Sequence, residues 1–370
     1  MHKQQHFSYQ DVFLKPRYSK HNSRSEIDTS VLFGHTKFKA PVVPANMKCT
    51  IDQKLARWMS ETGYFYIMHR FGLDESSKTP EACWEDNFKF IQQANLGTSP
   101  FDDRMNRQMW HNISVSIGVQ EGDKELLKRV VDAGYVIDYL TVDIAHAHSI
   151  RMEKMAEFIN GLKLRGRFPD TRPFLIAGNV ASPQAVVDVE SWNVDCTKVG
   201  IAQGGACTTY GQTGFGVPMF SCMLACNEAA KKPIIADGGI KTNGDFAKAI
   251  RAGGDMVMAG GLFACSTDSP AESFVKLMRT GEVKTKSDIG GGVVTSTYED
   301  RIVAKHYKRY YGSASSFNKH SDKHVEGRMV ELECDGVDYL TKLHHIEEAL
   351  QSATSYAGDD LRGVDWGIVY

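Results

Sequence analysis

Eight short runs rich in β-branched and apolar residues recur along the chain, separated by stretches with helical apolar spacing. This alternation is typical of βα units on a parallel sheet. Eight such units close naturally into a barrel, so we predict an α/β fold, a (β/α)8 TIM barrel with extended βα loops, as one domain over residues 1–370. The predicted strands are 41–45, 64–68, 113–117, 139–143, 174–178, 197–200, 233–237 and 256–259.

The stretches between these runs predict helices, and several begin at a plausible N-cap such as Ser182 followed by Pro183. The predicted helices are 125–133, 151–163, 182–191, 219–231 and 243–251.

Composition narrows the class of protein. With 370 residues, 42% of them hydrophobic, and a formal net charge of −2, the chain can bury a large core and has no bulk attraction to nucleic acid or anionic membranes. Residues 1–6 contain no apolar signal region, and the longest apolar run, 256–265, is too short to span a bilayer. Eight scattered cysteines fit a reducing compartment, so we expect a cytoplasmic protein.

Polar residues gather where the predicted strands end. Catalytic groups of a (β/α)8 barrel lie at the C-terminal ends of strands and in the loops that follow. A single strand-end Asn or Asp often only closes a turn, but here the placement is repeated on strand after strand. The residues are Asn46, His69, Arg70, Asp143, His146, Asn179, Cys207 and Asp237.

Cys207 lies in a loop with five glycines between 204 and 216, directly after a predicted buried strand. Most free cysteines are small buried hydrophobes, and no cysteine or histidine pair here has zinc spacing. Of the eight cysteines, only Cys207 combines a glycine-rich loop with a strand end, which favours a thiolate nucleophile.

Two glycine pairs indicate the class of ligand. Gly238-Gly239 and Gly260-Gly261 follow the last two predicted strands, where barrels commonly bind phosphate through bare backbone N–H groups. Asp237 precedes the first pair and is suited to accept hydrogen bonds from ribose hydroxyls. Together these features favour a nucleotide.

Motifs spread over nearly the whole chain resemble the IMP dehydrogenase/GMP reductase family, and its reductase side most closely. This resemblance implies a (β/α)8 barrel with a mobile catalytic flap, a purine nucleotide over Cys207, a nicotinamide cofactor packed on the purine, and a homotetramer. The motifs are YQDVFLKP at 9–16, NSRS at 22–25, PANM at 44–47, DIAH at 143–146, AGNV at 177–180, the Cys207 loop, ADGGI at 236–240 and YGSAS at 311–315.

The resemblance further implies NADPH-dependent reductive deamination of GMP to IMP and ammonia. Cys207 would add to C2 of the purine, ammonia would leave, and a hydride from NADPH would reduce the resulting thioimidate. Thr209 and Glu326 match the family's proton-handling pair, and a hydroxyl next to a carboxyl group can relay the proton that the leaving amine needs.

Binding residues carry over position by position from the same resemblance. Substrate contacts are implied for Asp237, Gly238, Gly239, Gly260, Gly261, Gly312, Ser313, Ala314 and Gly327. Cofactor contacts are implied for Ser23, Arg24, Arg70, Asp143, Ile144 and Ala145, with Ser352 and Tyr356 completing the site from a neighbouring subunit. A monovalent cation such as K+ would be held at Ala202, Gly204 and Cys207, although Ala202 and Gln203 replace a usual Gly and Pro and leave the cation requirement open.

Three alternatives remain open at this stage. One is IMP dehydrogenase-like oxidation, although residues 69–112 leave no room for the CBS insert of typical dehydrogenases, and Arg309-Tyr310 precedes the YGSAS motif that a water-activating pair should follow. The second is a deoxy or modified purine nucleotide as substrate, and the third is a purine-nucleotide-binding regulator. Residues 72–111 and 266–300 are enlarged loop segments. We expect them either to serve as lids or oligomer contacts or only to lengthen the loops.

Overall fold

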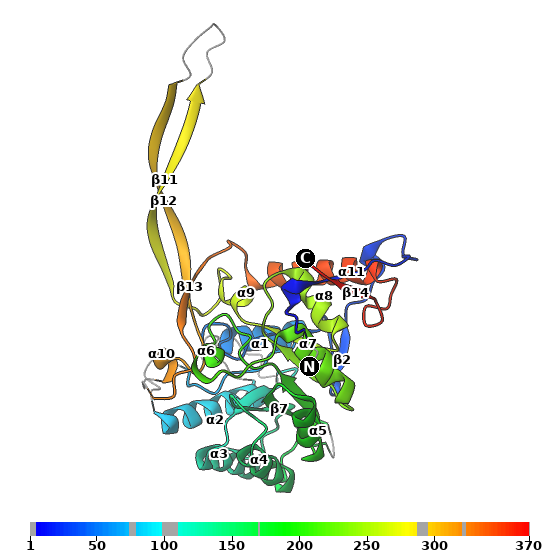
Figure 1. Ribbon diagram of the computed structural model, residues 1–370. Coiled ribbons are helices and arrows are strands. Elements are labelled where there is room, and N and C mark those ends of the chain that lie inside the picture. Colours follow the sequence, from blue (N-terminus) through cyan, green and yellow to red (C-terminus); the bar gives the residue numbers. More distant parts are fainter. Residues whose placement is uncertain are drawn as a thin grey trace.

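The computed structural model describes residues 5–73, 79–97, 110–168, 171–286, 295–319 and 323–369. Seven parallel strands form one curled sheet, and helices cover its outer face (Figure 1), so the predicted α/β barrel fold is confirmed. In spatial order the strands are β4 (Val42–Pro44), β10 (Met256–Ala259), β9 (Ile234–Asp237), β8 (Cys196–Val199), β7 (Phe174–Val180), β6 (Tyr139–Asp143) and β5 (Ser114–Ile117).

The predicted strand 64–68 occupies the eighth position without forming a regular strand. Only Met68 pairs with the sheet, in a parallel bridge to Val115 of β5. The reason is local, since the N–H of Tyr64 donates back to the carbonyl of Met59 and the segment leaves the preceding helix in a turn. Phe65 and Ile67 nevertheless point into the barrel and share its interior cluster with strand β4.

The helices lie close to their predicted positions. Helix α8 (Asn243–Arg251) has the predicted bounds, whereas α3 (Glu121–Asp132) begins four residues earlier than predicted because the Asp123 carboxylate accepts a hydrogen bond from the Gln120 N–H and caps the first turn. The other predicted helices are α4 (Ile150–Gly161), α5 (Pro183–Ser191) and α7 (Met219–Ala229). The structure adds helices that were not predicted, α1 (Gln53–Thr62), α2 (Pro80–Leu96), α6 (Thr209–Thr213), α9 (Gly261–Ala264), α10 (Ser316–Lys319) and α11 (Tyr339–Tyr356), and the short 3-10 turns η1 (Tyr9–Asp11) and η2 (Arg24–Glu26).

An aromatic plug closes the N-terminal end of the barrel. The hairpin of β2 (Val31–Phe33) and β3 (Thr36–Phe38) inserts Phe33 and Phe38 beneath the sheet. The ring of Phe33 lies 5.1 Å from that of Phe65 and 6.0 Å from that of Tyr139. A larger apolar layer packs between the outer face of the sheet and the helices. The charged side chains of the interior, Asp143, Lys198 and Asp237, lie at the other, C-terminal end.

Both enlarged segments contain regular structure, although their residues 74–78, 98–109 and 287–294 lie outside the described part of the chain. The first contains α2, which packs on α3. The second contains all of β11 (Ser273–Lys286) and the start of β12 (Thr295–Tyr311), which form a long antiparallel hairpin that projects away from the barrel (Figure 1). Strand β13 (Met329–Glu333) pairs with the base of β12, and β1 (Val12–Leu14) pairs with β14 (Trp366–Ile368).

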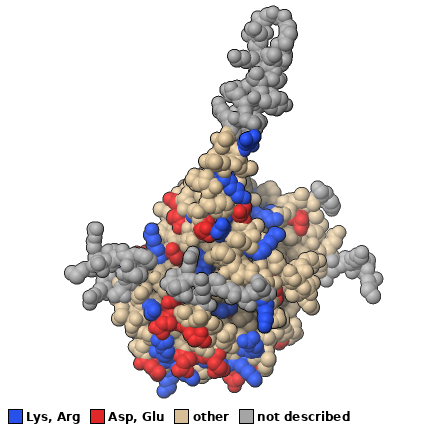
Figure 2. Space-filling model, turned by 90° about the vertical axis from the view of Figure 1, so that its left-hand side faces the viewer, with Lys and Arg blue, Asp and Glu red and all other residues tan. Residues whose placement is uncertain are grey.

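The surface carries charges of both signs. On the face shown in Figure 2, acidic and basic side chains are interspersed, most densely at the base of the molecule. Several of them form ion pairs, such as Glu121–Lys124 and Glu125–Lys128 of α3. Among the described residues, no helix is both long and apolar enough to cross a membrane.

The aromatic plug generates a stability prediction. Phe33 is 1% exposed, so Phe33→Ala should lower the free energy of unfolding by about 3–5 kcal/mol through lost burial and a cavity. Its neighbour Leu32 is 72% exposed, and Leu32→Ala should change that free energy by less than about 0.5 kcal/mol. Urea unfolding followed by circular dichroism measures both, and equal effects would contradict the assignment of Phe33 to the barrel interior.

Candidate active site

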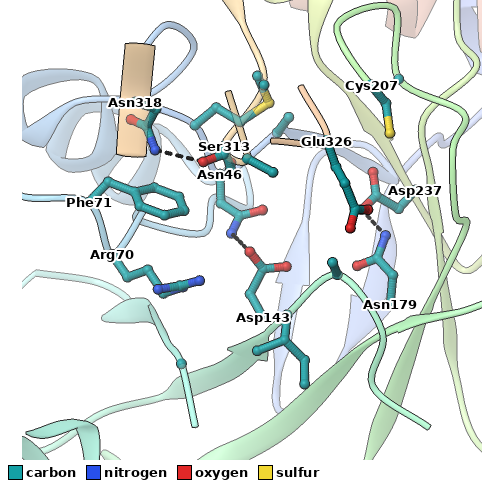
Figure 3. Close-up of a pocket in the computed structure, with 18 of the residues that line it drawn as sticks. Asn46, Arg70, Phe71, Asp143, Asn179, Cys207, Asp237, Ser313, Asn318 and Glu326 are labelled. Atoms are coloured by element: carbon teal, nitrogen blue, oxygen red, sulfur yellow. Dashed lines mark hydrogen bonds between the residues drawn. The ribbon is translucent and has the colours of Figure 1, made fainter. Parts of the chain in front are cut away.

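A cavity of about 700 Å3 opens at the C-terminal ends of the barrel strands. Its walls come from nearly every βα loop, so residues far apart in the sequence face one another across it (Figure 3). Cys207, Asp237 and Glu326 lie on one side of the view, Arg70 and Phe71 lie on the other, and Asp143 lies between them. The site is thus at the barrel end that the strand-end polar residues predicted.

A chain of hydrogen bonds joins the predicted nucleophile to a carboxylate. The Sγ of Cys207 donates to the Oγ1 of Thr209 over 3.2 Å, and that hydroxyl donates to the Oε2 of Glu326 over 2.8 Å. Backbone contacts hold the two segments together, because the Thr208 N–H donates to the Glu326 carbonyl and Cys207 forms an isolated bridge with Gly327. The arrangement provides a direct path for the thiol proton to Glu326.

The loop that carries Cys207 is tied at its base by a side-chain amide. The Nε2 of Gln203 donates to the carbonyls of Ile201 and Val217, over 3.0 and 2.6 Å. Ala202 has φ +66°, the left-handed conformation that a glycine adopts more readily, at a cost of about 1–2 kcal/mol. Ala202 therefore adopts a backbone conformation that is typical of glycine. The Gln203 amide connects the two ends of the loop through its hydrogen bonds to the carbonyls of Ile201 and Val217.

The floor of the site is an ion-pair network inside the barrel. The Nζ of Lys198, on β8, lies 2.9 Å from Asp143 at the end of β6 and 2.6 Å from Asp237 at the end of β9. Strand β7 lies between β6 and β8 and contributes Gly178, where a Cβ would lie 2.4 Å from the Cβ of Lys198. Glycine at this position therefore makes room for the lysine.

Asparagines complete the network. The Nδ2 of Asn46 donates to Asp143 over 3.1 Å, and the Nδ2 of Asn179 donates to Asp237 over 2.7 Å (Figure 3). Burial alone would raise the pKa of Asp143, but the charges of Lys198 and Arg70 outweigh burial and hold that pKa below its ordinary value. Burial alone would lower the pKa of Lys198, but the two carboxylates hold it above its ordinary value. Asp143 and Lys198 are therefore both ionised at neutral pH.

Two other titratable groups beside the site are neutral at neutral pH. Burial, helped by the charge of Lys48, lowers the pKa of His69 to about 3, and its Nδ1 accepts a hydrogen bond from the Phe71 N–H. Burial raises the pKa of Tyr310 above its ordinary value, and this side chain lines the cavity next to Gly260. The site thus combines one thiol, the ionised pair of Asp143 and Lys198, and neutral polar groups.

Comparison with known proteins identifies the family. The family model described as "IMP dehydrogenase / GMP reductase domain" matches residues 6–361. The chain belongs to this family. Among its relatives, proteins named GMP reductase from Enterococcus faecalis and Acidovorax sp. (strain JS42) are 41% and 38% identical to it, in each case over 98% of this chain and 96% of the relative. A protein of the same name from Staphylococcus aureus is 38% identical over the same shares.

The structure brings only some of the residues predicted from the family to the cavity. Besides Cys207, Thr209 and Glu326, the lining includes Asp237, Gly312, Ser313 and Ala314 on the substrate side and Arg70, Asp143, Ile144 and Ala145 on the cofactor side. Ala202 and Gly204, predicted to hold a cation with Cys207, also line it. The lining does not include Gly238, Gly239, Gly260, Gly261 or Gly327.

The remaining predicted cofactor residues form a separate cluster away from the cavity of the same chain. The guanidinium of Arg24 lies 5.5 Å from the ring centroid of Tyr356, and its Nη1 donates to the Oγ of Ser352 over 3.2 Å. Ser23 caps the short turn that carries Arg24. Tyr356 is 57% exposed, so this cluster is open to a neighbouring molecule.

Sequence reasoning missed Lys198, Trp84 and the Gln203 amide contacts. A lysine at an inward position of an otherwise apolar strand, next to Thr197 and Val199, was a signal for a buried ion pair. Trp84 lines the cavity from α2, and nothing local in the sequence indicates that its segment folds back to the site.

The ion-pair network generates a prediction about stability and pH. In the wild type, Asp143 has a lowered pKa, so its contribution to the free energy of unfolding is complete above its ordinary pKa and lost only at lower pH. Lys198→Met leaves two buried carboxylates without their cation, which should cost about 3–5 kcal/mol at pH 7. The pKa of Asp143 should then rise because the charge that lowers it is gone, so the variant should regain stability between pH 7 and pH 5 while the wild type does not.

Thermal unfolding at each pH measures this effect. Lys37→Met is the matched control, because the Lys37–Asp28 pair is exposed and should contribute less than about 1 kcal/mol. A Lys198→Met variant whose stability falls from pH 7 to pH 5 in parallel with the wild type would refute the network.

Proposed function

We propose that this protein catalyses the NADPH-dependent reductive deamination of GMP to IMP and ammonia through a covalent thioimidate on Cys207. The observation that carries the proposal is the hydrogen-bond path from Cys207 through Thr209 to Glu326 at the edge of the cavity. Relatives named GMP reductase, which align over nearly the whole chain, support it.

The relay accounts for the first half of the reaction. As the Cys207 sulfur bonds to C2 of the purine, the thiol proton passes through Thr209 to Glu326. The same path returns that proton to the exocyclic amine, the C2–N bond breaks, and ammonia leaves with a thioimidate on Cys207. Asp237 and the Gly312–Ala314 turn line the cavity beside Cys207 and would hold the ribose and the phosphate.

Bound NADPH would supply a hydride to C2, after which the C–S bond breaks, IMP forms and Cys207 returns. Residues present in the cavity fit a nicotinamide dinucleotide, because the Nε of Arg70 is buried without a hydrogen-bond partner among the described residues. A guanidinium in that state suits a phosphate oxygen. Asp143 is held in place by Lys198 and Asn46 and would orient ribose hydroxyls.

The dehydrogenase alternative finds less support. Arg309 forms hydrogen bonds from Nη1 to both carboxylate oxygens of Glu272, over 2.8 and 2.7 Å, so it is already engaged outside the cavity. The adjacent pair Arg309-Tyr310 therefore does not act together in the cavity, because only Tyr310 lines it. A deoxy or modified purine nucleotide remains compatible with the same chemistry at C2.

A monovalent cation at Ala202, Gly204 and Cys207 remains a prediction. The left-handed Ala202 preserves the backbone shape that glycine provides in relatives, which supports the proposal, whereas the Gly204 carbonyl already accepts the Cys207 N–H. Among the described residues, no cluster of three or more His, Cys, Asp or Glu side chains could hold a metal ion. We place the reaction in the cytoplasm, because none of the eight cysteines, all of which lie among the described residues, forms a disulfide.

Activity assays test the proposed reaction. Wild-type protein should consume NADPH with GMP, and Cys207→Ala should lower kcat by at least about 10^3-fold. Thr209→Val and Glu326→Gln should lower it by about 10^2- to 10^4-fold, since they interrupt the proton path. Cys334→Ala is the matched cysteine control and should leave kcat unchanged. Reduction of NAD with IMP, without NADPH consumption with GMP, would refute the proposal.

The separate Arg24–Ser352–Tyr356 cluster supports a homotetramer in which a neighbouring subunit completes each cofactor site. Cys207→Ala and Tyr356→Ala should each be nearly inactive alone. Co-refolded at equal amounts, they should recover activity at about a quarter of the sites, those with an intact Cys207 beside a neighbour's intact Tyr356. No recovery, from subunits shown to mix by native mass spectrometry, would mean that the cluster acts within its own chain.

A further inference from the structure

Helix α2 forms a wall of the candidate active site. Its N-cap Thr79 and its residues Pro80, Cys83 and Trp84 border the same cavity as Cys207. This helix belongs to the enlarged segment 72–111, which the family resemblance did not lead us to expect. The segment therefore adds to the site itself and is not merely a longer surface loop.

Trp84 is held flat against a glycine. A Cβ at Gly122 would lie 2.3 Å from each of three atoms of the six-membered ring of Trp84, so the Gly122 backbone sits over one face of the indole. The Nε1 of Trp84 donates to the Oδ1 of Asp123 over 3.2 Å. Glycine is a poor helix former, yet Gly122 lies in the first turn of α3, where any side chain would displace the indole.

Further contacts fix α2 to its surroundings. Glu85 pairs with Arg129 of α3 at 3.0 Å, and the Arg129 guanidinium also lies 4.1 Å from the ring centroid of Phe88. The Nδ2 of Asn87 donates to the carbonyl of Arg70 over 3.4 Å. Helix α2 thus carries Trp84 on a rigid support and also braces the loop that presents Arg70.

The side of the cavity formed by α2 and Arg70 lies opposite Cys207. Figure 3 shows Arg70 and Phe71 across the cavity from Cys207. Gly118 lies between Arg70 and Asp123, the hydrogen-bond partner of Trp84, because a Cβ at Gly118 would lie 2.9 Å from Asp123 and 3.4 Å from Arg70. Arg151 also lines the cavity, and no carboxylate of the described chain lies within ion-pair distance of Arg70 or Arg151. An aromatic ring near two guanidinium groups suits a second nucleotide with phosphate.

We propose that Trp84 selects the cofactor by packing its indole against the nicotinamide mononucleotide half of the dinucleotide, while Arg70 contacts the adjoining phosphate. The inference rests on the proposed function, because a purine that reaches Cys207 leaves the α2 side of the cavity to the hydride donor. The adenosine half of the bound cofactor would then extend out of the cavity toward the Arg24–Ser352–Tyr356 cluster of a neighbouring subunit. Helix α2 thus supplies an aromatic side chain to the wall of the cavity.

Steady-state kinetics of the full-length protein test the contact. Trp84→Ala should raise KM for NADPH about 5- to 10-fold, as loss of one aromatic contact predicts, with kcat and KM for GMP within about twofold of wild type. Gly122→Ala should raise the same KM, because its Cβ displaces the indole. The matched control is Gly161→Ala at the end of α4, where a Cβ meets nothing within 4 Å.

A double variant separates contact from general damage. In the double variant, Gly122→Ala should add little to the increase in KM for NADPH caused by Trp84→Ala, since both changes remove the same contact surface. If the two changes acted independently, their factors in KM would multiply. Trp84→Phe should retain part of the affinity and guards against an unfolded Trp84→Ala variant. With reduced nicotinamide mononucleotide as the hydride donor, Trp84→Ala should raise KM by the same factor as with NADPH. A rise in KM with NADPH alone would overturn the assignment of Trp84 to the nicotinamide mononucleotide half.

A binding titration keeps this inference distinct from the proposed reaction. NADPH binding, followed by energy transfer from tryptophan to the dihydronicotinamide, should show a higher Kd in Trp84→Phe and Trp84→Ala even without GMP. An unchanged Kd and KM for NADPH in folded Trp84 variants, or a rise confined to KM for GMP, would overturn the inference. Absence of GMP turnover by the wild type, with NADPH binding still dependent on Trp84, would refute only the proposed reaction.

Discussion

The ammonium of Lys198, buried between the carboxylates of Asp143 and Asp237, ties together the catalytic end of the barrel. Strands β6, β8 and β9 supply its charged groups, and two asparagines donate to it, Asn46 from just after β4 and Asn179 from near the end of β7. Because a buried charge without its partner is strongly unfavourable, each member requires the others. The network thus fixes the positions of Asp237 and Asp143 in the cavity wall, and it requires glycine at position 178.

The two enlarged segments use the barrel differently. Helix α2 returns to the site and contributes Trp84 to its wall. The β11–β12 hairpin projects away and exposes Val275, Leu277 and Ile302 on one face, the last two at 73% and 65%. A two-stranded hairpin gains little stability by itself in water, so its base depends on strand β13 and on packing around Tyr310. One enlarged segment therefore contributes to the site, and the other contributes to the surface.

Much of the barrel could be predicted because its signals are local. Helix α8 has its predicted bounds, and the seven paired strands lie within a few residues of the predicted runs, since strands buried on both faces leave short continuous runs in the sequence. The segment 64–68 shows the limit of this reasoning. Its apolar residues are buried as expected, but backbone pairing depends on the neighbouring strand and on the turn after α1, and only Met68 pairs. Helix α2 carried no comparable signal of where it would pack.

By itself, the sequence determined the βα alternation, the glycine-rich loop around Cys207 and the polar residues at the strand ends, because each depends on side chains close together in the chain. Only the tertiary structure decided that Glu326 reaches Thr209 across 117 positions, that Lys198 neutralises two carboxylates, and that Trp84 lies on Gly122. These contacts depend on closure of the barrel, which brings distant loops to one end and removes water from between them. Buried charges and stacked rings acquire their partners only then.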